Sequence, residues 1–221
     1  MYPIIKEIID ASEVECPVGY HKHSNGGGLV ADTAHVDETA YVGPFAKIRD
    51  RAQVLGHAKV LDSSVVSDNA IVRDSAKLSE GAFVYGSAEV YENAEIGEGA
   101  AVAGRAKIHG NAKIFGNAYV FDDAEVFENA KVSGCIYIQK MAKVFGNAIV
   151  SGTENAMSGN SKVYGNAKLC GEASMEDYAE LFGEAKLYDN AKLKGSAKVY
   201  GNAHLFGFQN LCEGEYYDGN L

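Results

Sequence analysis

Histidine is the residue type in this sequence that most readily supports acid–base or metal chemistry, because its imidazole exchanges a proton near neutral pH and binds transition metals. The six histidines are His21, His23, His35, His57, His109 and His204. Cys16, His21 and His23 are close enough in sequence to bind one ion together, but a structural zinc site has four ligands and no fourth follows. We therefore predict an ordinary N-terminal loop here and no metal site.

Most of the chain repeats every six residues. From Ala34 to Ala148 a small residue, nearly always alanine, recurs at this period, and Val, Ile or Leu follows it two positions later. Ile136 is the one large residue in that series, and after one inserted residue the pattern resumes at Ser161 and continues to Leu205. A period of six fits neither an amphipathic helix nor a long alternating strand, but it fits short strands separated by corners.

Each hexad supplies one strand and one turn. In Ala58-Lys59-Val60 the two apolar residues are two positions apart and face one side of a strand, whereas the lysine faces the other. The remaining three residues, typically Tyr-Gly-Asn, form the corner, because Gly and Asn best tolerate the positive φ angles that a tight corner needs.

The segment Val-Tyr-Gly-Asn-Ala-Lys resembles the hexapeptide repeat of the left-handed parallel β-helix, and the resemblance covers residues 34–206. Three hexads complete a coil in that family, so the resemblance implies an all-β, left-handed parallel β-helix of about ten three-sided coils. The opening Asn-Gly-Gly-Gly-Leu-Val-Ala-Asp is also similar to uncharacterised repeat proteins of bacteria and phages. We expect the β-helix over 29–206, an N-terminal cap over 1–28 and a C-terminal tail or cap over 207–221.

A cap is expected because open β-edges invite polymerisation. The isoleucines at 4, 5, 8 and 9 have helical spacing, so a short amphipathic segment could cover the first coil. Because Lys6 and Glu7 interrupt these isoleucines, we expect no signal peptide, and no apolar run of the sequence is long enough to span a bilayer.

Residues 18 apart lie above one another in such a prism, so the outward strand residues form three columns. One is largely lysine and the second mixes both charges. The third is apolar over five coils, and we name its residues the apolar stripe: Val65, Phe83, Ala101, Tyr119 and Tyr137. A contiguous apolar patch of this kind marks an interface, so we predict a homo-oligomer. Trimers are common in the family, which favours that state; the alternative is that strand-forming residues occupy these positions by propensity alone.

A second column lies at one corner, which we name the aromatic edge: Tyr91, His109, Phe127, Phe145, Tyr164, Phe182 and Tyr200. Rings at coil spacing can stack on one another and stabilise the column. A platform for a ligand or a partner is the alternative. Both interpretations require that the insertion after Val150 is a one-residue bulge.

The resemblance also implies an enzymatic alternative, because acyltransferases of this fold use a histidine as general base in a groove between subunits. His109 is the candidate, since it lies at a corner beside Tyr91 and Phe127 and near Lys107, where it could activate a hydroxyl. Acyl-CoA would then be the donor; otherwise we expect no cofactor. The repeat has no long excursion that would build an acceptor pocket, with 151–160 its one irregularity.

Composition narrows the function further. The net charge of −10 disfavours nucleic-acid binding. The four cysteines have no paired spacing, which favours a reduced, cytoplasmic protein. We predict a non-enzymatic, rod-like interaction module that binds another macromolecule and self-associates. The alternatives are the acyltransferase and a phage-type inhibitor of a host protein, although the lysine column argues against simple mimicry of DNA.

Overall fold

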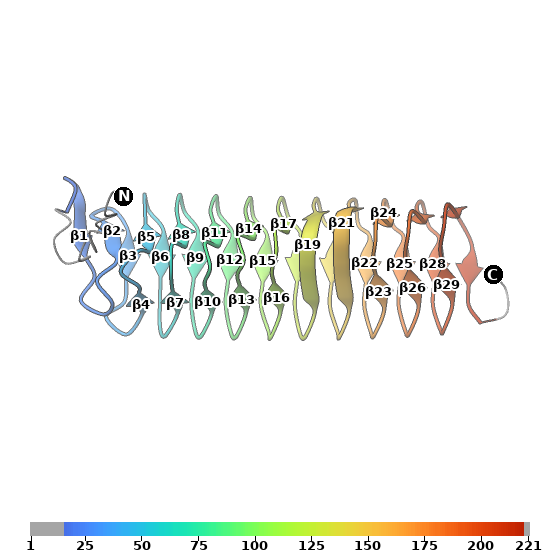
Figure 1. Cartoon of the computed structure of the whole chain (residues 1–221), viewed down its shortest axis with the longest axis horizontal. Helices are drawn as coiled ribbons and strands as arrows, with labels where there is room; N and C mark the ends of the chain where they lie inside the picture. The colour runs from blue at the N-terminus through green and yellow to red at the C-terminus, as the bar shows by residue number, and fades with distance from the viewer. Residues whose placement is uncertain (1–15, 219–221) are drawn as a thin grey trace, which may run out of the picture.

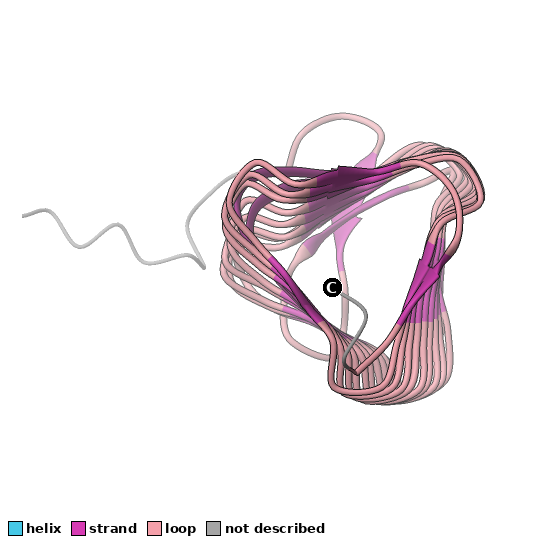
Figure 2. Cartoon of the chain, turned by 90° about the vertical axis from the view of Figure 1, so that its right-hand side faces the viewer, coloured by secondary structure: helices cyan, strands magenta, loops and turns pink. Residues whose placement is uncertain are grey.

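The computed structural model describes residues 16–218 and forms a rod with a triangular cross-section (Figures 1 and 2). Eleven strands stack along one of its faces. The described part is all-β, and its parallel strands form a solenoid of about ten coils, which confirms the predicted fold class. The predicted helical segment over 4–9 lies outside the described residues. Within 16–218 no helix has the length and apolar character needed to cross a membrane.

The lysine face carries β4 (Tyr41–Val42), β7 (Lys59–Val60), β10 (Lys77–Leu78), β13 (Glu95–Ile96), β16 (Lys113–Ile114), the first halves of β19 (Lys131–Ile138) and β21 (Ile149–Met157), β23 (Lys168–Leu169), β26 (Lys186–Leu187) and β29 (His204–Leu205). The mixed-charge face carries β3 (His35–Val36), β6 (Gln53–Val54), β9 (Ile71–Val72), β12 (Glu89–Val90), β15 (Lys107–Ile108), β18 (Glu125–Val126), β20 (Lys143–Val144), β22 (Lys162–Val163), β25 (Glu180–Leu181), β28 (Lys198–Val199) and β31 (Glu215–Tyr216). The third face carries β2 (Leu29–Ala31), β5 (Lys47–Ile48), β8 (Val65–Val66), β11 (Phe83–Val84), β14 (Ala101–Val102), β17 (Tyr119–Val120), the second halves of β19 and β21, β24 (Ser174–Met175), β27 (Lys192–Leu193) and β30 (Asn210–Leu211).

The register between coils confirms the three columns. Lys59 pairs with Lys77 and Phe83 with Ala101, each 18 residues apart. Across the insertion Lys143 pairs with Lys162, so the offset becomes 19 and the columns continue beyond it. The insertion is therefore a one-residue irregularity inside β21, as the continuation of both columns requires.

The interior contains the two apolar residues of each hexad. Along the column the alanines and the branched aliphatic residues have almost no exposed surface, as Ala76 and Leu78 show at 0%. Burial of this aliphatic series against the coils above and below is what stabilises a solenoid, which has no separate globular core. Ile136 fits at a small position because β19 runs unbroken through a corner from Lys131 to Ile138.

The corners differ from the prediction in one respect. At most corners the second residue has positive φ, and glycine occupies it in Tyr-Gly-Asn; the asparagine that follows is not in this conformation. Where glycine is missing, an acidic residue most often takes the position, as at Asp68 with φ of 59° and Glu92 with 58°, and Lys140 takes it with φ of 59°. The carboxylate of Asp68 accepts a hydrogen bond from the backbone N–H of Gly86 in the next coil, at 2.8 Å. This contact, repeated along the rod, offsets the conformational cost and explains many of the acidic residues.

Both ends of the described rod depart from the repeat. At the start, β1 (Tyr20–Lys22) pairs antiparallel with β2, so a hairpin covers the edge of the third face. At the other end, residues 207–218 add β30 and β31, which pair in parallel with β27 and β28. This segment of the predicted tail or cap therefore continues the winding.

Candidate functional site

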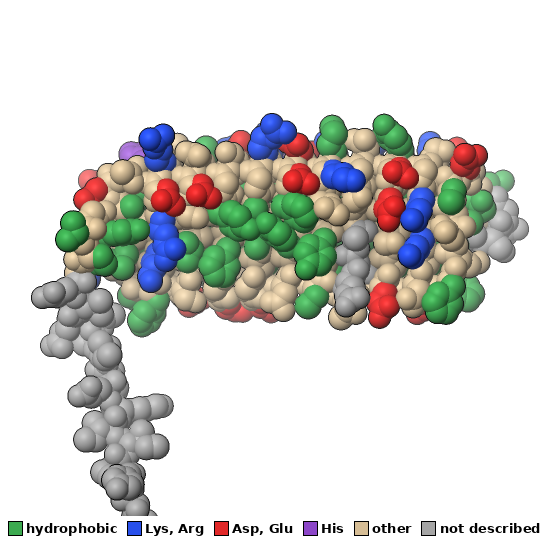
Figure 3. Space-filling model, turned by 90° about the horizontal axis from the view of Figure 1, so that it is seen from above, with side chains coloured by type: hydrophobic (Ala, Val, Ile, Leu, Met, Phe, Trp, Pro, Cys, Tyr) green, Lys and Arg blue, Asp and Glu red, His purple; other side chains and the backbone are tan. Residues whose placement is uncertain are grey.

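The apolar stripe is continuous along the third face. Its five residues pair with one another in successive coils, from Val65 to Tyr137. Phe83 and Tyr137 expose 45% and 51% of their surface. Figure 3 shows a band of hydrophobic side chains in the middle of the rod, with basic side chains toward both ends. The stripe is thus accessible apolar surface.

Neighbouring corner residues widen the stripe. The ring of Phe121 packs 4.5 Å from that of Tyr119, and the hydroxyl groups of Tyr85 and Tyr119 lie 2.6 Å apart. Burial and the hydrogen bond with Tyr85 raise the pKa of Tyr119 to about 12. Met141 is also exposed beside this corner. The sequence analysis missed these residues. Tyr85 and Phe121 lie two coils apart at the same corner, and arranging the corner residues in columns 18 positions apart would have found them.

The aromatic edge forms one uninterrupted stack of parallel rings. The centroids of Phe127 and Phe145 are 4.9 Å apart, with an angle of 5° between the planes. The same geometry joins all seven predicted residues, with centroid distances of 4.7–5.1 Å. Arg73 extends the stack at one end, 4.1 Å above Tyr91, and Tyr217 at the other, 5.3 Å from Tyr200.

A ladder of side-chain amides accompanies the ring stack. Each asparagine two positions after an edge residue donates to the one in the next coil, for example Asn111 to Asn129 at 3.1 Å. The ladder runs through Asn93, Asn111, Asn129, Asn147 and Asn166 and ends on Glu184. Ring faces and amides at this edge are therefore largely satisfied by their own neighbours, which favours a stabilising role.

His109 lies inside the ring stack. Its ring is 4.7 Å from that of Tyr91 and 5.1 Å from that of Phe127, and the planes are nearly parallel. The Nε2 atom lies 3.2 Å from Oε1 of Glu125, and Nδ1 lies 3.9 Å from a carboxylate oxygen of Glu92. A substrate hydroxyl would have to displace Glu125 before Nε2 could act as a base.

Glu125 links His109 to the face beside it. Its second carboxylate oxygen accepts a hydrogen bond from Lys143 at 2.7 Å. Burial raises the pKa of Glu125, but the hydrogen bonds from Lys143 and His109 outweigh burial, so its pKa is lowered overall. The carboxylate therefore remains ionised and holds both donors.

The N-terminal residues suggested by their spacing do not converge. Cys16 donates to the carbonyl of Tyr20, the Nδ1 atom of His21 lies 3.1 Å from Asp32, and Nδ1 of His23 lies 3.1 Å from the carbonyl oxygen of Asn25. Among the side chains that the structure describes, no three His, Cys, Asp or Glu residues form a group that could hold a metal ion. All four cysteines are free.

Comparison with known proteins adds no further identification. The sequence matches no family model and no curated protein.

Proposed function

We propose that this chain is a non-enzymatic interaction module of the hexapeptide-repeat β-helix class, which self-associates through the apolar stripe. The observation that carries the proposal is the exposure of Phe83 and Tyr137 on one face of a rod whose other two faces are charged. Exposed apolar patches on soluble proteins are typical of interaction sites.

The chemistry of the three faces favours a second copy of the chain as the occupant. On the lysine face Lys59 pairs directly with Lys77, so two such faces would repel each other. The stripe has no charged outward strand residue from Val65 to Tyr137, and two stripes can meet without burying a charge. Rods aligned side by side bring the stripes together over their whole length.

The apolar stripe alone is too small to form a stable interface, so neighbouring residues must contribute to the contact. Five coils at the strand spacing give a length of about 19 Å, whereas a stable interface buries about 800 Å² on each partner. Tyr85, Phe121 and Met141 must therefore take part. The resemblance to trimeric β-helix proteins makes a trimer the expected state.

The test is the oligomeric state of a variant with Phe83→Glu and Tyr137→Glu. Both side chains are exposed, so the substitutions should leave the fold intact while placing charges in the contact. We expect wild-type protein to sediment as an oligomer and the double variant as a monomer in analytical ultracentrifugation.

Ile149→Glu is the matched control. Ile149 points outward on the lysine face and pairs with Lys131 and Lys168, so a carboxylate there meets favourable charges. This variant should retain the wild-type mass. A monomeric wild-type protein, or equal dissociation by the control, would contradict self-association through the stripe.

A further inference from the structure

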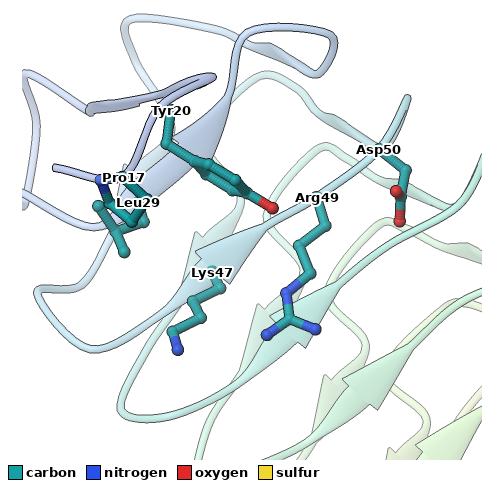
Figure 4. Close-up of a pocket in the computed structure, with 6 residues that line it drawn as sticks. All are labelled: Pro17, Tyr20, Leu29, Lys47, Arg49 and Asp50. Carbon is teal, nitrogen blue, oxygen red and sulfur yellow. The ribbon is translucent and has the colours of Figure 1, made fainter.

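A hollow of about 420 Å³ lies where the N-terminal hairpin meets the first coils. It is lined by Pro17, Tyr20, Leu29, Lys47, Arg49 and Asp50. Figure 4 shows the side chains of Lys47 and Arg49 extending in the same direction, with the hydroxyl group of Tyr20 turned toward Arg49. The volume lies within the range of small-molecule sites.

The register of the hairpin explains why the hollow forms. Tyr20 pairs with Ala31, and Leu29 pairs with Lys47 in the next coil. Ala31 and Arg49 are 18 residues apart, so they occupy equivalent positions in successive coils. Because alanine has only a methyl group, no long side chain fills the position between Tyr20 and Arg49, and both residues line the hollow. Pro17 and Leu29 supply an apolar wall beside it.

Neither cation of the hollow is neutralised by a carboxylate in the described part of the chain. Among the side chains that the structure describes, no carboxylate forms an ion pair with Lys47 or Arg49. The nearby Asp50 accepts a hydrogen bond from the backbone N–H of Asp68 at 3.1 Å, the corner contact that recurs along the rod. In a chain of net charge −10, two neighbouring cations that line one hollow without a carboxylate partner among the described side chains indicate an anionic ligand.

The chain contains an internal comparison for this site. Lys192 and Lys194 occupy the same two positions of a later coil, one outward on β27 and one at the following corner. There Lys194 pairs with Glu176 at 3.3 Å, and no hairpin strand lies over the pair. Two cations at these positions alone do not make the hollow; the hairpin and the lack of a carboxylate partner distinguish Lys47 and Arg49.

We propose that the hollow binds a small phosphomonoester that carries an apolar ring. A phosphomonoester has a charge of about −1.5 to −2 at neutral pH, which matches one lysine and one arginine. The guanidinium can donate two parallel hydrogen bonds to phosphate oxygens, and the ammonium group and the Tyr20 hydroxyl can donate others. The ring of the ligand would pack against Pro17, Leu29 and Tyr20.

Phenyl phosphate is the probe, titrated into the full chain and followed by isothermal calorimetry or by shifts of backbone amide signals. Saturable binding that weakens with added salt is expected. Lys47→Gln and Arg49→Gln should each weaken binding about tenfold, since each removes a charge-assisted hydrogen bond. Inorganic phosphate should bind more weakly than phenyl phosphate, and phenol should not bind, because the charge and the ring each contribute.

Lys192→Gln with Lys194→Gln is the matched control and should leave the affinity unchanged. Thermal unfolding of every variant should stay close to that of the wild type, because Lys47, Arg49 and Lys192 are exposed and the pair of Lys194 with Glu176 is a surface ion pair, which contributes little to stability. An absence of saturable binding up to about 10 mM phenyl phosphate would overturn the proposal. Equal losses in the control pair would also overturn it, because they would show general attraction to cations. Neither result depends on the oligomeric state, so this test is separate from that of self-association.

Discussion

The carboxylate of Asp122 accepts a hydrogen bond from the backbone N–H of Lys140, one coil further along the same corner, at 3.1 Å. Both residues have a φ of 59°. The side chain of Asp122 accepts this hydrogen bond, whereas Lys140 contributes only its backbone N–H and its side chain gains no contact from the hydrogen bond. Gly104 precedes them at this corner and adopts the same conformation with φ of 67°. Glycine, aspartate and lysine thus adopt the same backbone conformation at this corner, but the conformational free energy that each of them loses differs.

Lys140→Gly should therefore stabilise the protein. The left-handed conformation costs a residue with a side chain about 1–2 kcal/mol, and glycine loses about 0.5–1 kcal/mol through its greater freedom in the unfolded chain. The net gain in the free energy of unfolding should be about 0.5 kcal/mol. Urea denaturation measures it.

Gly104→Ala is the opposing control at the same corner. A Cβ atom at Gly104 would lie 2.7 Å from the backbone nitrogen of Asp122, which cannot move without disturbing the next coil. A loss of at least about 2 kcal/mol is expected from the clash and the conformation together. If both variants changed the free energy of unfolding in the same direction, the positive φ angle would not explain the stability of this corner.

Ser64 offers a stabilising substitution in the interior. It occupies a small position of the repeat with 0% of its surface exposed, and its hydroxyl has no hydrogen-bond partner among the described residues. An unsatisfied buried hydroxyl costs about 1–3 kcal/mol, so Ser64→Ala should raise the free energy of unfolding by about 1 kcal/mol. Ala70→Ser, the reverse change at the next small position, should lower it by a similar amount. A destabilised Ser64→Ala variant would show that the hydroxyl is satisfied in solution.

The ring stack should contribute measurably to stability. Phe145 lies 4.9 Å from both Phe127 and Tyr164, and aromatic pairs contribute about 0.5–1.5 kcal/mol each. Phe145→Ala should therefore cost about 1–3 kcal/mol, whereas Phe145→Tyr keeps the ring and should be nearly neutral. Phe45→Ala, at a phenylalanine that is 65% exposed, is the reference. If Phe45→Ala and Phe145→Ala lowered the free energy of unfolding equally, the ring stack would not contribute to stability.

The period of the sequence was sufficient to predict the columns, because residues 18 apart lie above one another wherever the repeat is unbroken. This is why Phe83 and Tyr119 could be assigned to one face and Tyr91 and Phe127 to one corner. The repeat carries no information about residues 16–28, so the position of Tyr20 over Arg49 required the structure. The role of acidic residues at the corners was also missed, since it depends on a contact between coils.

The alkaline stability of the rod should depend on Tyr164. Burial, followed by its hydrogen bond and proximity to Glu180, raises the pKa of this phenol from 10.0 to about 12. A raised pKa in the folded state means that the neutral form stabilises the fold: the contribution is complete below pH 10 and is lost as the pH rises toward 12. The difference in Tm between wild type and Tyr164→Phe should thus be largest near neutral pH and should shrink across that interval. Glu180→Gln, which keeps an acceptor but removes the charge, should lower the pH at which the contribution is lost. A difference in Tm that persists unchanged to pH 12 would show that the Tyr164 hydroxyl does not titrate in this way.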